Sequence, residues 1–150
     1  MAEEPLKAGD IAPDFALPNE AGEPVKLADL RGQRVVLYFY PMDDTPGCTL
    51  QACSFRDSYA DIQERQAIVV GISPDSEASH QAFKTKYDLP FLLLVDADHT
   101  VAQTYGAWQE ATGYIKRSQF IIDESGRLVD VQVPVKATES LQRALDALTR

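Results

Sequence analysis

One run of residues sets the architecture of this chain: Tyr38-Phe39-Tyr40-Pro41-Met42-Asp43-Asp44-Thr45-Pro46-Gly47-Cys48-Thr49-Leu50-Gln51-Ala52-Cys53. It contains both cysteines of the 150-residue sequence. The run begins as an apolar strand, passes through a turn bounded by prolines, and continues as a helix. The pattern therefore predicts a cysteine thiol at the start of a helix, shortly after a buried strand.

The start of this helix follows from local rules. Thr45 suits the N-cap position, where its hydroxyl can accept a hydrogen bond from the first turn, and Pro46 suits the first helical position. Cys48 then falls in the first turn, where free backbone N–H groups and the positive end of the helix dipole favour a thiolate. Asp43 and Asp44 oppose this negative charge, so we expect a cation from elsewhere in the chain.

The spacing between Cys48 and Cys53 limits what the two thiols can do. Five residues of α-helix rise about 7.5 Å and turn about 140°, which separates the two Cα atoms by about 8.7 Å. A disulfide requires a separation below about 7 Å, so the helix must unwind locally before the bond can form. This suits a redox switch better than a structural crosslink. Spacing and capping alone also leave open that both cysteines are inert core thiols, since free cysteine is often buried.

Length and composition fit one globular domain spanning 1–150 that needs no disulfide or metal to fold. The net charge of −9 and the pI near 4.6 argue against nucleic acid or an anionic membrane as a partner. The N-terminal residues 1–7 contain no apolar segment. We therefore expect neither a signal peptide nor a membrane span, and a cytoplasmic location.

The remaining sequence alternates between strand and helix patterns. The expected strands are 14–17, 24–27, 34–40, 67–73, 89–95, 113–122 and 127–133, with a hairpin formed by the first two and another by the last two. The expected helices carry the apolar stripe Cys48, Ala52, Phe55, Tyr59 and Ile62, follow a cap at Asp75 or Ser76 and end at Tyr87, cover 99–105, and follow a cap at Thr138. This order predicts an α/β fold with a central mixed β-sheet flanked by helices and an N-terminal β-hairpin. Thioredoxin-like folds keep their reactive thiol at such a strand-to-helix junction, although the spacing here is Cys-x4-Cys.

Several motifs occur in a recognisable order along most of the chain. Pro41, Thr45 and Cys48 form the pattern Pro-x-x-x-Thr-x-x-Cys. The others are Ala12-Pro13-Asp14-Phe15, Val70-Gly71-Ile72-Ser73, Lys86-Tyr87-Asp88-Leu89-Pro90-Phe91, Tyr105-Gly106-Ala107-Trp108, and Arg117-Ser118 before Phe120-Ile121-Ile122-Asp123. On these motifs the sequence resembles the peroxiredoxins, and among them the bacterioferritin-comigratory-protein group, also called peroxiredoxin Q.

The resemblance implies a thioredoxin-like fold and a role for each matching residue. Cys48 would be the peroxidatic cysteine, and Cys53 would resolve its sulfenic acid as an intramolecular disulfide. Thr45 would hydrogen-bond the thiolate and the peroxide, and Pro41 would shield the site from water. Arg117 would supply the missing cation.

The same resemblance implies the reaction and its partners. The substrates would be hydrogen peroxide and organic hydroperoxides, and thioredoxin or a glutaredoxin would reduce the disulfide by exchange. The role would be antioxidant defence and redox homeostasis, with no metal, flavin or haem. An intramolecular disulfide needs no second subunit, which favours a monomer.

The sequence departs from the family pattern in places, and other functions remain open. Gln119 stands where the group usually has Thr or Ser, Met42 where a charged residue is common, and the segment 108–114 is short. A sensor that uses the disulfide as a switch, and an oxidoreductase acting on protein disulfides, are the alternatives. His80 and His99 show no ligand spacing to the cysteines, so we expect no metal site and place both histidines on helix surfaces.

Overall fold

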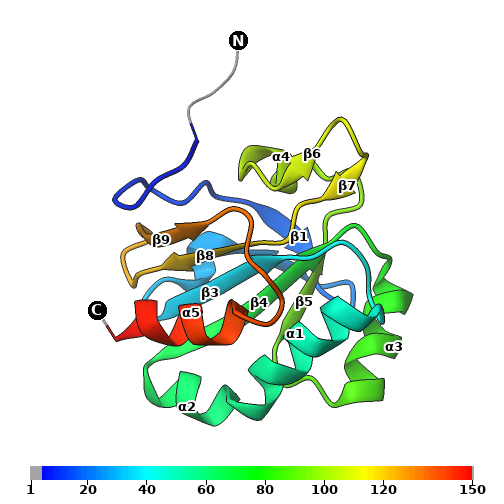
Figure 1. Ribbon diagram of the computed structural model, residues 1–150, viewed down its shortest axis with the longest axis horizontal. Helices are drawn as coiled ribbons and strands as arrows, with labels where there is room; N and C mark the ends of the chain where they lie inside the picture. Colours follow the sequence, from blue (N-terminus) through cyan, green and yellow to red (C-terminus); the bar gives the residue numbers. More distant parts are fainter. Residues whose placement is uncertain (1–4, 150) are drawn as a thin grey trace.

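The computed structural model describes residues 5–149 (Figure 1). Residues 1–4, part of the N-terminal segment considered above, and residue 150 lie outside this range. A central sheet has the strand order β5-β4-β3-β8-β9. Its strands are β3 (Arg34–Phe39), β4 (Ala67–Ser73), β5 (Leu92–Val95), β8 (Ser118–Ile122) and β9 (Leu128–Gln132). β3, β4 and β5 are mutually parallel, whereas β8 runs antiparallel to both β3 and β9. The expected α/β fold with a mixed sheet is therefore confirmed.

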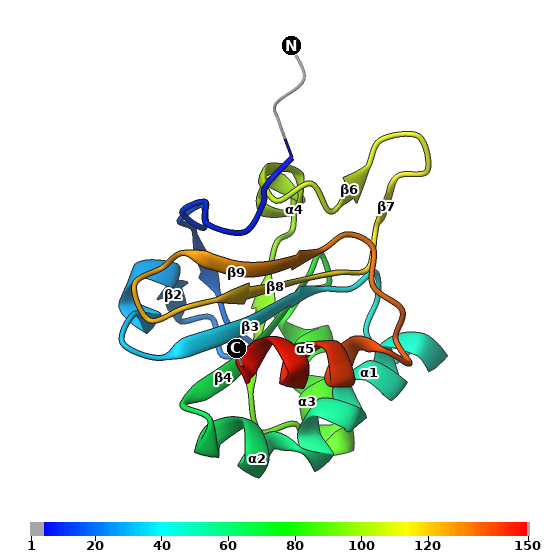
Figure 2. The same ribbon diagram turned by 60° about the vertical axis from the view of Figure 1, so that its left-hand side comes forward.

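Helices and short strands cover both faces of this sheet. The helices are α1 (Pro46–Asp57), α2 (Tyr59–Glu64), α3 (Glu77–Tyr87), α4 (Thr100–Thr104) and α5 (Ser140–Leu148). In Figure 2, α1, α2, α3 and α5 lie on one side of the sheet, and α4 lies on the other with β6 (Trp108–Gln109) and β7 (Tyr114–Ile115). The N-terminal hairpin is also present, formed by β1 (Ala16–Pro18) and β2 (Pro24–Lys26) and followed by a 3-10 turn at Leu27–Leu30.

The strand β3 explains why both faces of the sheet must be covered. Alternate side chains of a strand point to opposite faces. Val36 and Tyr38 pack in the core beneath α1, α2, α3 and α5, whereas Val35, Leu37 and Phe39 pack in the core beneath α4. A run of apolar residues without alternation is what a strand buried on both faces requires. β3 therefore lies between the two cores and ends just before the loop that leads to α1.

Several boundaries differ from those expected. The predicted long helix breaks at Ser58, where the backbone leaves helical geometry (φ −110°, ψ 12°), so α1 and α2 are separate. The strand expected at 89–95 begins only at Leu92, after Pro90, which has no N–H for a ladder. The long strand expected from 113 is divided, because β7 pairs with β6 and only β8 joins the sheet.

The structure also shows which residues begin α3 and α5. Ser76, not Asp75, caps α3, since its hydroxyl accepts a hydrogen bond from Ser79 N. Thr138 does not cap the terminal helix, which begins at Ser140 after Glu139. Across residues 5–149, no helix is long and apolar enough to cross a membrane.

Candidate active site

Cys48 occupies the position that the sequence predicts. Thr45 is the N-cap residue in an extended conformation (φ −97°, ψ 156°), Pro46 is the first helical residue, and Cys48 is the third. Thr49 N donates to Thr45 O at 2.8 Å and closes the first turn. The Cys48 residue is only 1% exposed, so its thiol lies inside the protein at the positive end of α1.

The Thr45 side chain does not cap the helix, and this part of the prediction is wrong. Its hydroxyl donates to Met42 O at 2.9 Å instead. The hydroxyl hydrogen is thus used within the loop, while the oxygen can still accept a hydrogen bond. Some first-turn N–H groups of α1 are therefore left for the thiol or for a ligand to use.

Arg117 provides the cation that the acidic loop requires. It precedes β8, and the antiparallel pairing of β8 with β3 brings it to the start of α1. Its Nη1 and Nη2 atoms each lie 3.5 Å from Cys48 Sγ. A guanidinium at this distance stabilises a thiolate by charge and by hydrogen bonding.

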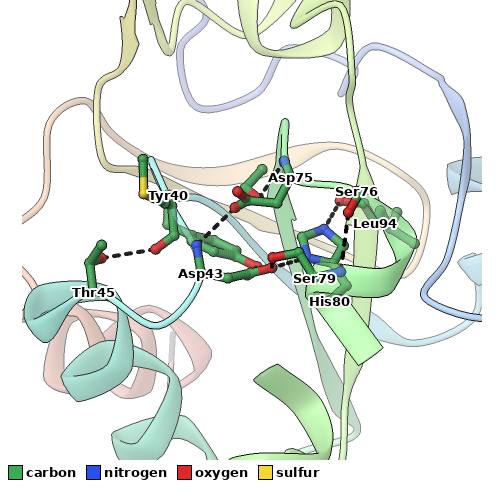
Figure 3. A network of polar contacts seen from close by, with 10 residues as sticks. Tyr40, Asp43, Thr45, Asp75, Ser76, Ser79, His80 and Leu94 are labelled. Atoms are coloured by element: carbon green, nitrogen blue, oxygen red, sulfur yellow. Dashed lines mark hydrogen bonds and ion pairs between the residues drawn. The ribbon is translucent and has the colours of Figure 1, made fainter. Parts of the chain in front are cut away.

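The two loop carboxylates are engaged away from the thiol. Asp44 accepts hydrogen bonds from Lys86 Nζ at 2.7 Å and Tyr87 Oη at 2.8 Å, and these partners lower the pKa of its carboxyl. Asp43 is bound by Tyr40 and by α3, as Figure 3 shows. Arg117 can therefore act on Cys48 with less opposition than the sequence alone suggests.

A buried chain of polar side chains holds Arg117 in place. Its Nη1 donates to Gln51 Oε1 at 2.7 Å, and Gln51 Nε2 donates to Ser140 Oγ at 2.9 Å. Ser140 Oγ donates to Gln119 Oε1, and Gln119 Nε2 donates to Gln132 Oε1 at 3.0 Å. The chain links α1, α5, β8 and β9 to the guanidinium.

The sequence alone did not predict most of these hydrogen-bonded side chains. Gln51, Ser140 and Gln132 were not singled out, and Gln119 was noted only as a departure from the family pattern. The available signal was Gln119 and Gln132, each in a mostly apolar strand, because buried amides are nearly always hydrogen-bonded. Which partners they find depends on elements far apart in the sequence.

The second cysteine and the loop proline lie where the sequence places them. Cys53 is half-buried on α1, and both cysteines are free thiols. Pro41, also half-buried, begins the loop between β3 and α1. Cys48 and Arg117 are thus in direct contact, Thr45 and Pro41 lie in the loop that leads to them, and Cys53 lies further along the helix.

His80 is not on a helix surface, and the expectation for it is wrong. Its side chain is fully buried, with Nδ1 2.6 Å from Asp43 Oδ2 and Nε2 2.9 Å from Leu94 O. The reason is that the buried face of α3 runs through His80 and Phe83. His99 is half-buried at the start of α4, and its ring stacks on Trp108 with centroids 3.7 Å apart.

Asp43, Asp75 and His80 bring their ligand atoms within 4.8 Å of one another. Protein donors already engage the two carboxylates. Asp75 Oδ2 accepts from Ser73 Oγ at 2.7 Å and from Asp43 N at 2.8 Å, and Asp43 accepts from Tyr40 and Ser79. The trio therefore has the character of a hydrogen-bond network that ties the loop to α3.

Fold and site together define a class of protein: a thioredoxin-like α/β domain with a buried helix-start cysteine beside an arginine. The model of the AhpC/TSA family matches residues 8–131, and the chain belongs to this family. Peroxiredoxin Bcp of Bacillus subtilis is 44% identical over 149 residues, covering 95% of each chain, and Peroxiredoxin Bcp of Escherichia coli K12 is 45% identical over 133 residues, covering 85% of each.

Solved structures of similar proteins have the same fold. The crystal structure of peroxidoxin BcpB from Mycobacterium tuberculosis superimposes with a TM-score of 0.90 at 36% identity, covering 96% of this chain and 97% of that one. A PrxQ mutant of Xylella fastidiosa gives a TM-score of 0.89 at 27% identity, covering 98% of each chain. Within the family the chain is a peroxiredoxin of the Bcp/PrxQ type, a thiol-dependent enzyme that reduces peroxides.

Proposed function

We propose that this peroxiredoxin reduces hydrogen peroxide and organic hydroperoxides through Cys48 and regenerates it through an intramolecular disulfide with Cys53. The observation that carries the proposal is the contact between Cys48 Sγ and both terminal nitrogens of Arg117, at 3.5 Å each. This contact favours the thiolate, and it places positive charge where the peroxide oxygens gain negative charge. A merely structural core thiol has no need of a guanidinium.

The first step is attack of the Cys48 thiolate on one peroxide oxygen. The O–O bond breaks, Cys48 becomes a sulfenic acid, and the second oxygen leaves and takes up a proton as water or an alcohol. Thr45 Oγ1, whose hydrogen is donated to Met42 O, accepts a hydrogen bond from the peroxide O–H. Pro41, at the start of the same loop, limits access of water to the thiolate.

The second step requires α1 to open. The intact helix keeps the two Cα atoms too far apart for a disulfide, so the first turns unwind before Cys53 can reach the sulfenic acid. The Cys53 thiol then displaces water and forms the disulfide. A dithiol protein, thioredoxin or a glutaredoxin, reduces the disulfide by exchange. One domain spanning 1–150 can complete this cycle as a monomer, since both thiols belong to one helix. The cytoplasm, where thiols are kept reduced, suits such a cycle.

The test is rapid mixing of the reduced protein with hydrogen peroxide, followed by intact mass, for wild type and two variants. Wild type is expected to lose two hydrogens, Cys48→Ser to remain unchanged, and Cys53→Ser to gain one oxygen. Turnover with thioredoxin and with a glutaredoxin then identifies the reductant. A wild-type reaction no faster than that of a free thiol, or a disulfide between two chains, would refute the proposal.

A further inference from the structure

The loop that carries Pro41 and Thr45 is fixed by one residue, Asp43. Its carboxylate accepts hydrogen bonds from Tyr40 Oη at 2.5 Å and Ser79 Oγ at 2.8 Å, and it lies 2.6 Å from His80 Nδ1. Its backbone N–H donates to Asp75 Oδ2 at 2.8 Å. Figure 3 shows these groups around Asp43: Tyr40 just after β3, Asp75 in the turn before α3, and Ser79 and His80 on α3. Asp43 is therefore held by two buried partners, Tyr40 and His80, and by two half-buried ones, Asp75 and Ser79.

The ring of His80 makes this anchor an ion pair. Nε2 faces the carbonyl oxygen of Leu94, which can only accept, so Nε2 carries a hydrogen. Nδ1 faces Asp43 Oδ2, which also accepts from Ser79 Oγ. A carboxylate oxygen has no hydrogen to donate, so Nδ1 donates as well. Both nitrogens are therefore protonated and the ring is an imidazolium. Burial works to lower the pKa of His80, but the hydrogen bond and charge of Asp43, with a smaller effect of Asp75, raise it overall.

We propose that the buried Asp43–His80 pair is a positioning lock that holds the Pro41–Thr45 loop over Cys48. This rests on the proposed roles of Cys48 and Thr45. Asp43 is two residues from Pro41 and two from Thr45, so fixing it fixes both. The Thr45 hydroxyl is itself held to the neighbouring residue, through Met42 O.

The lock is independent of the helix that must open. The partners of Asp43 described above come from the residue that follows β3, the turn before α3, and α3 itself, and none of them lies on α1. His80 is in turn fixed to β5 through Leu94 O. When the first turns of α1 unwind, these contacts need not break. The loop therefore stays in place and offers the same N-cap geometry on which α1 re-forms after the disulfide is reduced.

The test compares two variants of one position, Asp43→Ala and Asp43→Asn, in the Cys53→Ser background. Two rate constants of Cys48 are measured for each: reaction with hydrogen peroxide, and alkylation by iodoacetamide. Peroxide reduction needs the Thr45 oxygen in place, whereas alkylation needs only an accessible thiolate. Asp43→Ala is expected to lower the peroxide rate at least tenfold and the alkylation rate less than threefold.

Asp43→Asn is the conservative control. Its amide can donate to a neutral His80 Nδ1 and still accept from Tyr40, so the loop stays in place. We expect its ratio of peroxide rate to alkylation rate to remain within threefold of the parent. A folded Asp43→Ala variant with the parent ratio, or with both rates lowered equally, overturns the lock.

If Asp43→Ala does not fold, His80→Leu replaces it, since it removes the ion pair and leaves the Tyr40 and Ser79 donors to Asp43. A parent ratio in that variant also overturns the proposal. Failure of the proposed function has a different signature, because the parent protein would then react slowly with peroxide, and that result rejects both proposals together.

Discussion

Replacing Gly47 with alanine should separate the catalytic geometry of this site from its stability. Gly47 is the second residue of α1 and has helical backbone angles, so alanine fits the backbone. A Cβ atom at this position would lie 2.9 Å from Arg117 Nη2 and 3.7 Å from its Cζ. The new methyl group therefore meets the guanidinium and not the backbone.

The magnitude follows from these distances. An unstrained contact between such atoms is about 3.5 Å, so the guanidinium must shift by about 0.6 Å. Arg117 Nη2 is already 3.5 Å from Cys48 Sγ, and the shift weakens that contact. A hydrogen bond to a charged group contributes about 1.5–3 kcal/mol. Losing roughly 1 kcal/mol of this corresponds to a drop of about fivefold in rate.

The free energy of unfolding of Gly47→Ala should be equal to that of wild type or higher. Alanine is favoured over glycine in a helix by up to about 1 kcal/mol, and the atoms that the new methyl group meets are at the far end of the Arg117 side chain, not in the backbone. Urea unfolding of Gly47→Ala is thus expected at or above the wild-type midpoint. The second-order rate constant with hydrogen peroxide, measured by stopped flow, should fall about fivefold.

Two controls make the result decisive. Leu50→Ala changes an exposed side chain at the same end of α1, and we expect a rate near that of wild type. In the Arg117→Met background, Gly47→Ala should have no further effect, because the group it displaces is gone. A wild-type rate for Gly47→Ala, or an equal loss in the Arg117→Met background, would refute the role of Arg117 inferred from its position.

Three further outcomes are expected. Gly71→Ala places a Cβ 2.9 Å from Tyr38 Cζ in the neighbouring strand, and urea unfolding should show a loss of about 1–3 kcal/mol; an unchanged midpoint would contradict the packing described. Ser140→Ala removes the hydroxyl that pairs with Gln51 Nε2 and Gln119 Oε1, at a cost of about 1–3 kcal/mol, and should also slow peroxide reduction by loosening Arg117. Gln142→Ala, on the exposed face of α5, should do neither. The pKa of His80 is raised in the folded state, so its stabilising contribution is complete below the unfolded pKa of about 6.5 and is lost as pH rises through the folded value. The free energy of unfolding of wild type, relative to Asp43→Asn, should therefore decline as pH rises above about 6.5, with Asp75 and Tyr40 as the other ionisable groups facing the ring. A difference independent of pH would show that His80 is neutral.

Much of the active site could be predicted because its rules are local. The N-cap position of Thr45, Pro46 at the first helical position and Cys48 in the first turn depend on neighbours within a few residues. The separation of Cys48 and Cys53 follows from helix geometry alone. The apolar run that became β3 had no alternation, which indicates burial on both faces wherever its partners lie.

The side chains that complete the site were decided by the tertiary structure. Arg117 reaches Cys48 from 69 residues away because β8 pairs antiparallel with β3, and no local pattern encodes that pairing. The sequence pattern placed His80 on a helix surface. It is buried because α3 packs this face toward β5 and Asp43. The local sequence predicted that the Thr45 hydroxyl would cap α1, but in the folded loop it donates to Met42 O.

The physical reason for this division is the range of the forces involved. The sequence by itself determined where a helix starts, which strands are apolar, and how far apart two thiols on one helix lie, since backbone sterics and hydrogen bonding act within a turn. Only the tertiary structure decided which charges meet. A buried ion or amide is stable only beside its partner, and that partner is supplied by whichever strand or helix the sheet topology brings alongside.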